Sequence, residues 1–237
     1  MEKLEPQIYD RYIKALKDIS QAITSDLYLE ELLKLIVMVT AKVTGVEICS
    51  LWLVDDTETP MKIRMKASQT IDPVYIKDRA LNLNEGVVGW VVTHKRPFIT
   101  EDVLGESIFK EKDMAQALGL VSMASVPLLV KGEQVIGVLN CFTAVPHKFA
   151  PTEVNLIQTV ANQAAVAILN TELMVKTRVI QEELEARKLI ERAKDILMRR
   201  RNKTGDDAYQ WIRKRSMDTR QSMRRVAEAI ILAEELE

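Results

Sequence analysis

The chain has 237 residues, of which 47% are hydrophobic, so it is long and apolar enough to bury one large or two small cores. Its 8 glycines and 7 prolines are too few for a disordered chain, and no apolar run reaches the roughly 20 residues of a membrane span. The polar N-terminus does not resemble a signal peptide and the two cysteines form no disulfide framework, which predicts a cytoplasmic protein without a membrane partner.

The N-terminal part of the chain is predicted to form two helices and a β-hairpin. Apolar residues recur at helical spacing over residues 4–24 and again over residues 29–43, and Gly45 is a suitable helix stop. Residues 47–54 are typical of a buried strand, which returns after a polar turn as a second strand over residues 61–68.

The middle of the chain is predicted to hold more loops and a second hairpin. Gly86 opens a short helix, and residues 96–102 form a brief strand followed by an acidic turn. A helical stretch then reaches about Leu118. The runs 122–130 and 134–143 are rich in β-branched residues and are joined by a Lys-Gly-Glu turn, which is a strong hairpin pattern.

This order of elements resembles the GAF sensor domain. The resemblance covers roughly residues 10–172 and implies an α+β fold, in which an antiparallel sheet is flanked by helices. GAF domains bind many different ligands or none, so the resemblance leaves open an unidentified small-molecule ligand and implies no cofactor. We assign the sensor to residues 1–165. The segments that carry the resemblance are Glu85–Val91, Arg96–Asp102, Val126–Leu128 and Val135–Leu139.

A long helix is predicted from Pro151 to about Arg201, since no glycine or proline interrupts it. Its apolar residues include a seam that steps alternately by three and four, as in a coiled coil. A final step of four changes the phase of the seam. We interpret residues 166–183 as a signalling helix that pairs in a homodimer; the alternative is a single amphipathic helix that lies on its own domain. The seam consists of Val166, Leu169, Leu173, Ile180 and Leu184, with Lys176 between them.

The C-terminal segment differs in charge from the rest of the chain. Residues 185–227 hold 14 Lys and Arg but only 6 Asp and Glu, although the whole chain has a net charge of -1. Such asymmetry favours a polyanionic partner for this segment alone. Thr204 is a suitable N-cap for a helix over residues 205–217, and a third helix is expected over residues 219–236.

The same segment holds a series of spaced features. They are Arg187-Lys188, Glu191, Ala193-Lys194, Ile196-Leu197-Met198, Ala208-Tyr209, Ile212-Arg213, Ser216-Met217 and Val226-Ala227. With these features the segment resembles the ANTAR domain, a three-helix RNA-binding module of bacterial transcription antiterminators, although Asp195 stands where the family usually has glycine. The resemblance implies binding to RNA hairpins in nascent leader transcripts, and we assign residues 184–237 to this module.

Cationic side chains with an aromatic neighbour suit RNA, because phosphates attract cations and unpaired bases stack on flat rings. Tyr209 and Trp211 cannot both point into the helical core, so one of them is expected to be exposed. The candidate RNA-binding residues are Lys188, Arg192, Tyr209, Arg213, Lys214, Arg220, Arg224 and Arg225.

Other candidate sites have ordinary structural explanations. The acidic pair Asp55-Asp56 is expected to be a turn, and the glycines of Gly86–Gly89 a closely packed helix entry. His94 and His147 lack partners at metal-ligand spacing. Five methionines could line a pliable pocket or simply fill a core; they are Met38, Met61, Met65, Met114 and Met123.

The two cysteines, Cys49 and Cys141, fall in predicted strands and are most simply core residues. A redox pair would require them to face one another. No residues have the spacing of a catalytic constellation, and we therefore expect a regulator that is not an enzyme. The predicted function is signal-controlled antitermination through RNA binding. The alternative is a protein-interaction adaptor whose helical tail docks a protein partner.

Overall fold

A computed structural model describes residues 29–57, 59–69, 79–131, 134–201 and 204–236. The chain forms two compact units, residues 1–172 and 173–237. The helix expected over residues 4–24 lies outside the described residues.

The first unit is built on one antiparallel sheet of six strands in the order β3-β2-β1-β6-β5-β4. The two long hairpins supply its centre, because β1 pairs with both β2 and β6. The strands are β1 (Ile48–Asp55), β2 (Lys62–Ser68), β3 (Ala80–Asn82), β4 (Phe98–Thr100), β5 (Ser122–Val130) and β6 (Gln134–Thr143).

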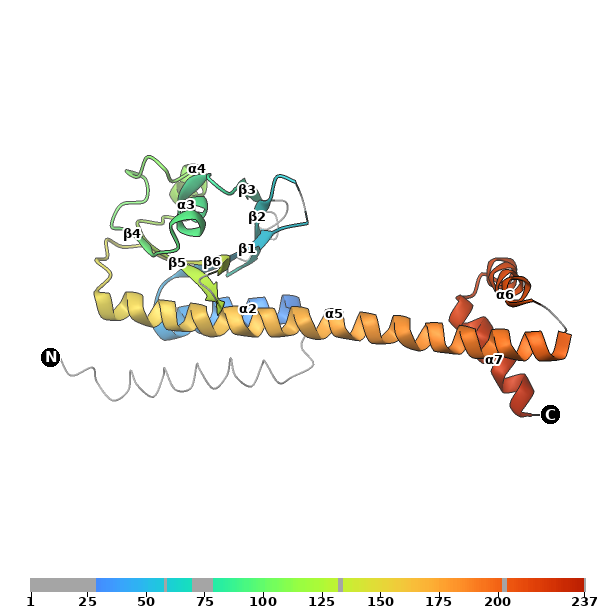
Figure 1. The fold of residues 1–237 in the computed structure, drawn as a ribbon. Coiled ribbons are helices and arrows are strands. Elements are labelled where there is room, and N and C mark those ends of the chain that lie inside the picture. Colours follow the sequence, from blue (N-terminus) through green and yellow to red (C-terminus); the bar gives the residue numbers. More distant parts are fainter. Residues whose placement is uncertain (1–28, 58, 70–78, 132–133, 202–203, 237) are drawn as a thin grey trace. The chain divides into compact units, whose positions relative to one another are not determined.

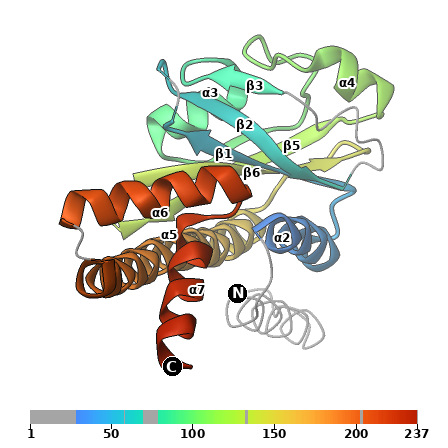
Figure 2. The same cartoon turned by 90° about the vertical axis from the view of Figure 1, so that its right-hand side faces the viewer.

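Helices cover both faces of this sheet (Figures 1 and 2). Helix α2 (Leu29–Thr44) and the first part of α5 (Pro151–Arg201) lie on one face, and α3 (Gly86–His94) and α4 (Lys112–Ala117) lie on the other. Alternate side chains of each strand point to opposite faces, so the sheet separates two apolar cores. In β1, for example, Leu51 joins the core under α5 and Trp52 joins the core under α3.

The α+β class predicted from the sequence is correct, and most element boundaries agree with the prediction. Strands β5 and β6 and helix α5 begin and end at the expected residues. Gly45 and Gly86 have φ angles of 74° and 68°, which explains why glycine stands where one helix stops and another starts.

The second unit consists of the end of α5, α6 (Gly205–Thr219) and α7 (Met223–Glu235). Its core joins Ala193 and Leu197 of α5 to Ile212 of α6 and to Ala227 and Ile231 of α7. Small alanines at the contacts allow three short helices to approach one another closely.

The third helix begins later than predicted. We expected it to start at Thr219, but α6 continues through Thr219 and α7 starts only at Met223. Arg220 adopts a left-handed conformation (φ 52°) that ends α6, and Ser222 then caps α7 by accepting a hydrogen bond from the backbone N–H of Arg225. Glycine usually marks such a helix end, so the end of α6 had no sequence signal. Ser222, a common N-cap residue, was a signal for the start of α7 that the prediction did not use.

Candidate nucleic-acid interface

Helix α6 has one face fixed against the core of the second unit. Thr204 caps its start as predicted, since its Oγ1 accepts a hydrogen bond from the backbone N–H of Asp207 and donates one to the Asp207 carboxylate at 2.7 Å. One turn apart, Ala208 and Ile212 are fully buried against α5 and α7. The opposite side of α6 is therefore held in place and available to a ligand.

The two aromatic residues of α6 have different environments. Trp211 is partly buried and packs against the helical core, whereas Tyr209 is 40% exposed. Arg213 follows Tyr209 by four residues and Met217 follows by eight, so the three side chains share one flank of the helix. Met217 is also exposed. This flank offers a flat ring, a guanidinium and a polarisable thioether side by side.

The turn between α6 and α7 adds further cations. Gln221 donates from its backbone N–H to the carbonyl of Ser216, and the Ser216 hydroxyl donates to the carbonyl of Gln221 at 2.6 Å. These two bonds fix the turn that carries Arg220. Arg225 lies in the first turn of α7 and is exposed.

Most of the predicted RNA-binding cations have no acidic partner among the described residues. They are Lys188, Arg213, Lys214, Arg220 and Arg225, all of which are exposed. We name the α6 flank and the adjoining turn, with Tyr209, Arg213, Lys214, Met217, Arg220 and Arg225, the α6 face.

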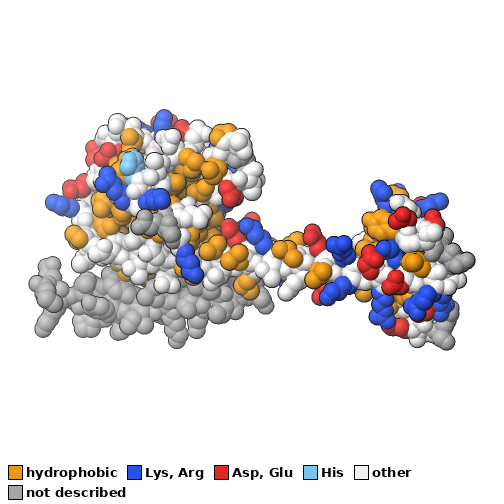
Figure 3. Space-filling view, viewed as in Figure 1, with side chains coloured by type: hydrophobic (Ala, Val, Ile, Leu, Met, Phe, Trp, Pro, Cys, Tyr) orange, Lys and Arg blue, Asp and Glu red, His pale blue; other side chains and the backbone are white. Residues whose placement is uncertain are grey.

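Two predicted cations are instead engaged in ion pairs within the second unit. Arg192 pairs with Glu235 at 2.9 Å, and Arg224 is half-buried and pairs with Glu228 at 2.9 Å. The hydrogen bond to Glu228 raises the pKa of Arg224 above its ordinary value. Figure 3 shows the resulting mixture of basic and acidic side chains over this unit. The sequence analysis expected both arginines to bind RNA. The partner of Arg192 lies on another helix, whereas Glu228 follows Arg224 by four residues, a spacing from which that pair could have been predicted.

The apolar seam of α5 that we predict to pair in a coiled coil lies largely in solvent. Leu173 is 51% exposed, Ile180 is 64% exposed, and Val166 and Leu184 are exposed as well, while Leu169 is partly buried. In contrast, the neighbours Ala165 and Ala167 of Val166 are fully buried against the sheet. The seam is therefore on a different side of α5 from the face that packs on the sheet.

A pocket opens on the face of the sheet that carries α3 and α4. Trp52 lines it and its indole Nε1–H is buried without a hydrogen-bond partner among the described residues. Three of the five methionines noted in the sequence, Met65, Met114 and Met123, line it as well, whereas Met38 and Met61 are exposed. Ser50 and Asn140 supply polar atoms to the lining.

The remaining candidates take structural positions. Asp55 ends β1, accepts hydrogen bonds from the backbone N–H and the hydroxyl of Thr57, and pairs with Arg64 at 3.2 Å. His94 stacks on Trp90, and His147 contacts Glu153 at 3.1 Å. Among the described residues, no three His, Cys, Asp or Glu side chains are grouped to hold a metal ion. No helix in the described ranges is long and apolar enough to cross a membrane.

Comparisons with known proteins match the two units to different families. The sequence model of the family described as GAF domain matches residues 27–169, and that of the family described as ANTAR domain matches residues 178–231. Two relatives, each named transcriptional regulatory protein PdtaR, come from two strains of Mycobacterium tuberculosis. Both are 43% identical over 61 residues, which are 26% of this chain and 30% of theirs. The chain thus spans less than a third of the length of these relatives.

Solved structures resemble the first unit in fold. The GAF domain of a phosphoenolpyruvate-protein phosphotransferase from Coxiella burnetii aligns with a TM-score of 0.62 and 22% identity, covering 70% of this chain and 98% of that one. The corresponding Acinetobacter domain gives 0.58 and 23%, covering 70% and 97%. A free methionine-R-sulfoxide reductase from Neisseria meningitidis, in complex with its substrate, gives 0.58 and 16%, covering 73% and 96%. At these identities the likeness establishes the fold alone.

Proposed function

Because the chain belongs to the GAF domain family and carries an ANTAR domain after it, we propose that it is a transcription antitermination regulator. In this proposal the second unit binds RNA hairpins of nascent leader transcripts in the cytoplasm, and the GAF domain controls that binding. A relative that is 43% identical to this chain over 61 residues is itself named a transcriptional regulatory protein, which supports the proposal.

The observation that carries the proposal is the α6 face. Arg213, Arg220 and Arg225 are exposed cations without acidic partners among the described residues, on a turn and a helix whose backbones are fixed by hydrogen bonds. Cations in fixed positions suit a phosphate backbone, and Tyr209 beside them suits stacking on an unpaired loop base.

The test is a triple substitution of Arg213, Arg220 and Arg225 by alanine in the full chain. Loss of three phosphate contacts should reduce the slope of log affinity against log salt by about 0.7–0.9 for each contact. Hairpin RNA affinity is measured by fluorescence anisotropy across a salt series. A matched control removes three exposed lysines of the GAF domain, Lys42, Lys66 and Lys148, by the same change.

An unchanged affinity and salt slope in the arginine variant would contradict RNA binding by this face. If the parent protein itself ignores hairpin RNA at low salt, the adaptor function gains support. The exposed leucines Leu232 and Leu236 of the second unit are then the first candidates for contact with a protein partner.

We further propose that the protein acts as a homodimer through residues 166–183. Two RNA hairpins call for two RNA-binding units, and the exposed apolar seam at Leu173 and Ile180 gives a second copy of the chain a surface to cover.

The phase change before Leu184 allows the seam two packings, so a signal could change the pairing of the helices. Disulfide cross-linking between cysteines placed at Leu173 or Leu184, in a variant without the native cysteines, tests this. Identical cross-linking with and without RNA would contradict the mechanism.

A small-molecule ligand that controls the GAF domain would bind in the pocket beside Trp52. The cavity measures only about 30 Å³, so a ligand that fits it unchanged is very small. The apolar lining and the unpartnered indole N–H favour a ligand that is largely apolar and carries one hydrogen-bond acceptor. Native mass spectrometry of the protein purified from its own host would reveal such a ligand.

A further inference from the structure

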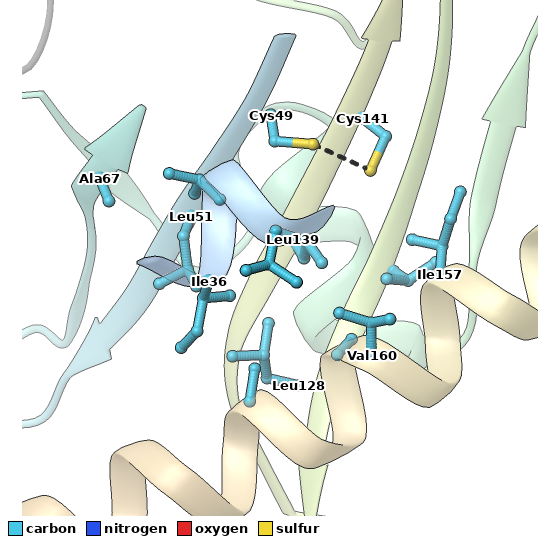
Figure 4. Close-up of a cluster of buried hydrophobic side chains, with 14 of the residues drawn as sticks. Ile36, Cys49, Leu51, Ala67, Leu128, Leu139, Cys141, Ile157 and Val160 are labelled. Carbon is cyan, nitrogen blue, oxygen red and sulfur yellow. Dashed lines mark hydrogen bonds between the residues drawn. The ribbon is translucent and has the colours of Figure 1, made fainter. Parts of the chain in front are cut away.

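The two cysteines of the chain face one another in the centre of the sheet. Cys49 of β1 and Cys141 of β6 are directly opposite in the strand register, although 92 positions separate them in sequence. Their Sγ atoms are 3.5 Å apart and both side chains are fully buried (Figure 4). The fold therefore meets the condition that a thiol–disulfide pair requires.

The hydrogen bonding of β1 places this pair at the position where opposing side chains are closest. The backbone N–H of Cys49 donates to the side-chain Oε1 of Gln69 at 2.9 Å, and its carbonyl accepts from the N–H of Gln69 at 3.1 Å. Both backbone groups of Cys49 thus point away from β6. In such a non-hydrogen-bonded pair the Cα atoms lie about 4.5 Å apart, within the range of about 4.4–6.8 Å that a disulfide spans. Rotation of the side chains would bring the sulfur atoms together without moving the strands.

We propose that Cys49 and Cys141 form a site of reversible oxidation, at which hydrogen peroxide converts the two thiols into an intramolecular disulfide. One thiol loses its proton and the resulting thiolate attacks a peroxide oxygen. The O–O bond breaks, the departing hydroxide takes up that proton and leaves as water, and the cysteine becomes a sulfenic acid. The second sulfur then attacks the sulfenic sulfur, the S–O bond breaks, and a second water leaves. Two thiols have then lost two protons and two electrons, and one peroxide has become two waters.

The surroundings of the two cysteines determine which oxidant can reach them and how fast they are oxidised. Cys49 and Cys141 belong to the same apolar core cluster as Ile157 and Val160 of α5 and Leu139 of β6, so a charged oxidant is excluded and a small neutral peroxide is favoured (Figure 4). Burial raises the pKa of the Cys49 thiol well above its ordinary value, and its neighbour Cys141 raises it further. Thiolate is therefore scarce at neutral pH and oxidation is slow. The same burial protects the disulfide from thiol reductants, so the site responds to sustained exposure.

Oxidation should also stabilise the first unit. The bond would join two central strands across a long loop and restrict the unfolded chain. It would form inside the core on which α5 packs. The inference concerns the GAF domain alone and does not depend on RNA binding.

The experiment exposes the reduced full-length protein to hydrogen peroxide for hours without denaturant. We expect the thiol count after unfolding to fall from two to zero, and a peptide to appear in which Cys49 and Cys141 of one chain are linked, with a mass two hydrogens below that of the two reduced peptides. Exposed methionines such as Met38 and Met217 also take up oxygen under these conditions, so the mass of the intact chain is not the readout. A strong reductant should restore both thiols. Thermal unfolding of the oxidised protein should shift to a higher temperature.

The Cys49→Ala and Cys141→Ala variants are the controls, and their unfolding temperatures should not rise after the same treatment. Retention of both thiols in the folded protein, under conditions that oxidise the same protein in urea, would overturn the proposal. A link between two chains, or oxygen added to Cys49 or Cys141 without a link, would overturn it as well. If neither variant folds, the thiol count and the peptide map of the parent protein decide.

Discussion

Arg192 in α5 donates a hydrogen bond from its guanidinium to Glu235 at the end of α7, at 2.9 Å. Two turns further along α5, Arg200 pairs with Glu234, the preceding residue of α7. The acidic end of α7 therefore neutralises two arginines of a segment that is otherwise strongly basic. Neither pair is buried, so each contributes only about 0–1 kcal/mol and a phosphate group can replace the glutamate.

The first prediction follows from this competition. Replacing Glu234 and Glu235 by glutamine should release Arg192 and Arg200 for RNA and raise hairpin affinity about three- to tenfold. The salt slope should steepen by about 0.7–0.9 for each arginine that gains a phosphate. Anisotropy titrations across a salt series measure both quantities.

Glu172 and Glu183 provide the control for that prediction. Both are α5 glutamates without a cationic partner among the described residues, and their change to glutamine removes the same charge. If the control raised hairpin affinity equally, the change in net charge alone would explain the higher affinity. The ion pairs of α7 would then not compete with RNA.

The second prediction separates stability from binding at Arg220. Its left-handed backbone is strained in any residue with a Cβ, and glycine relieves that strain. Arg220→Gly should therefore stabilise the second unit by about 0.5–1 kcal/mol, while Arg220→Ala keeps the strain. Both variants should lose RNA affinity to the same extent, because both lose the guanidinium. Urea unfolding and anisotropy are the two measurements. A glycine variant that binds RNA as well as the parent protein would remove Arg220 from the interface.

The fold could be predicted where a local signal marks each boundary. The strands β5 and β6 are bounded by a turn, and α5 runs from a proline to a cationic end, so their limits were predicted correctly. The boundary between α6 and α7 was not, because Arg220 ends α6 where glycine is usual and the N-cap Ser222 was not used to place the start of the next helix. Local sequence predicts a helix end when a common residue such as glycine stands there, and in this chain an arginine ends α6.

The candidate site was harder to predict, because tertiary contacts decide which cations are available to RNA. Composition identified the basic segment, and helical spacing predicted that one of Tyr209 and Trp211 would be exposed. No local pattern could show that Arg192 meets Glu235, 43 residues away, or that Cys49 meets Cys141. Such pairs follow from how whole helices and strands are arranged.

The third prediction concerns the seam of α5. Ile180→Glu should weaken dimerisation at least tenfold, since each copy loses an apolar contact of about 1.5–3 kcal/mol and gains an unpaired carboxylate. Val175 supplies the matched control, because it is equally apolar and 56% exposed but lies on another side of the same helix. Val175→Glu should leave the dimer intact. Light scattering across a dilution series reports the subunit number. Equal effects of the two changes, or a monomeric parent protein, would contradict the seam as the interface.

The fourth prediction is a pH dependence at the end of β1. The hydroxyl and the backbone N–H of Thr57 donate hydrogen bonds to Asp55, and together with Arg64 they lower the pKa of this carboxyl below its ordinary value of 3.8. A lowered folded pKa means that the charged carboxylate stabilises the folded state. This contribution is complete above pH values near 3.8 and is lost as the pH falls through the folded pKa.

Asp55→Asn should therefore lower the unfolding temperature of the first unit at neutral pH. The difference from the parent protein should shrink once the pH falls below 3.8. Thermal unfolding followed by circular dichroism over a pH series measures this difference. Asp56→Asn changes the neighbouring carboxyl, which has no hydrogen bond to another described residue, and should not reproduce the effect at neutral pH. If the unfolding temperatures of Asp55→Asn and the parent protein differed by the same amount at every pH, the Thr57 contacts would stabilise the fold through their geometry and not through the charge of Asp55.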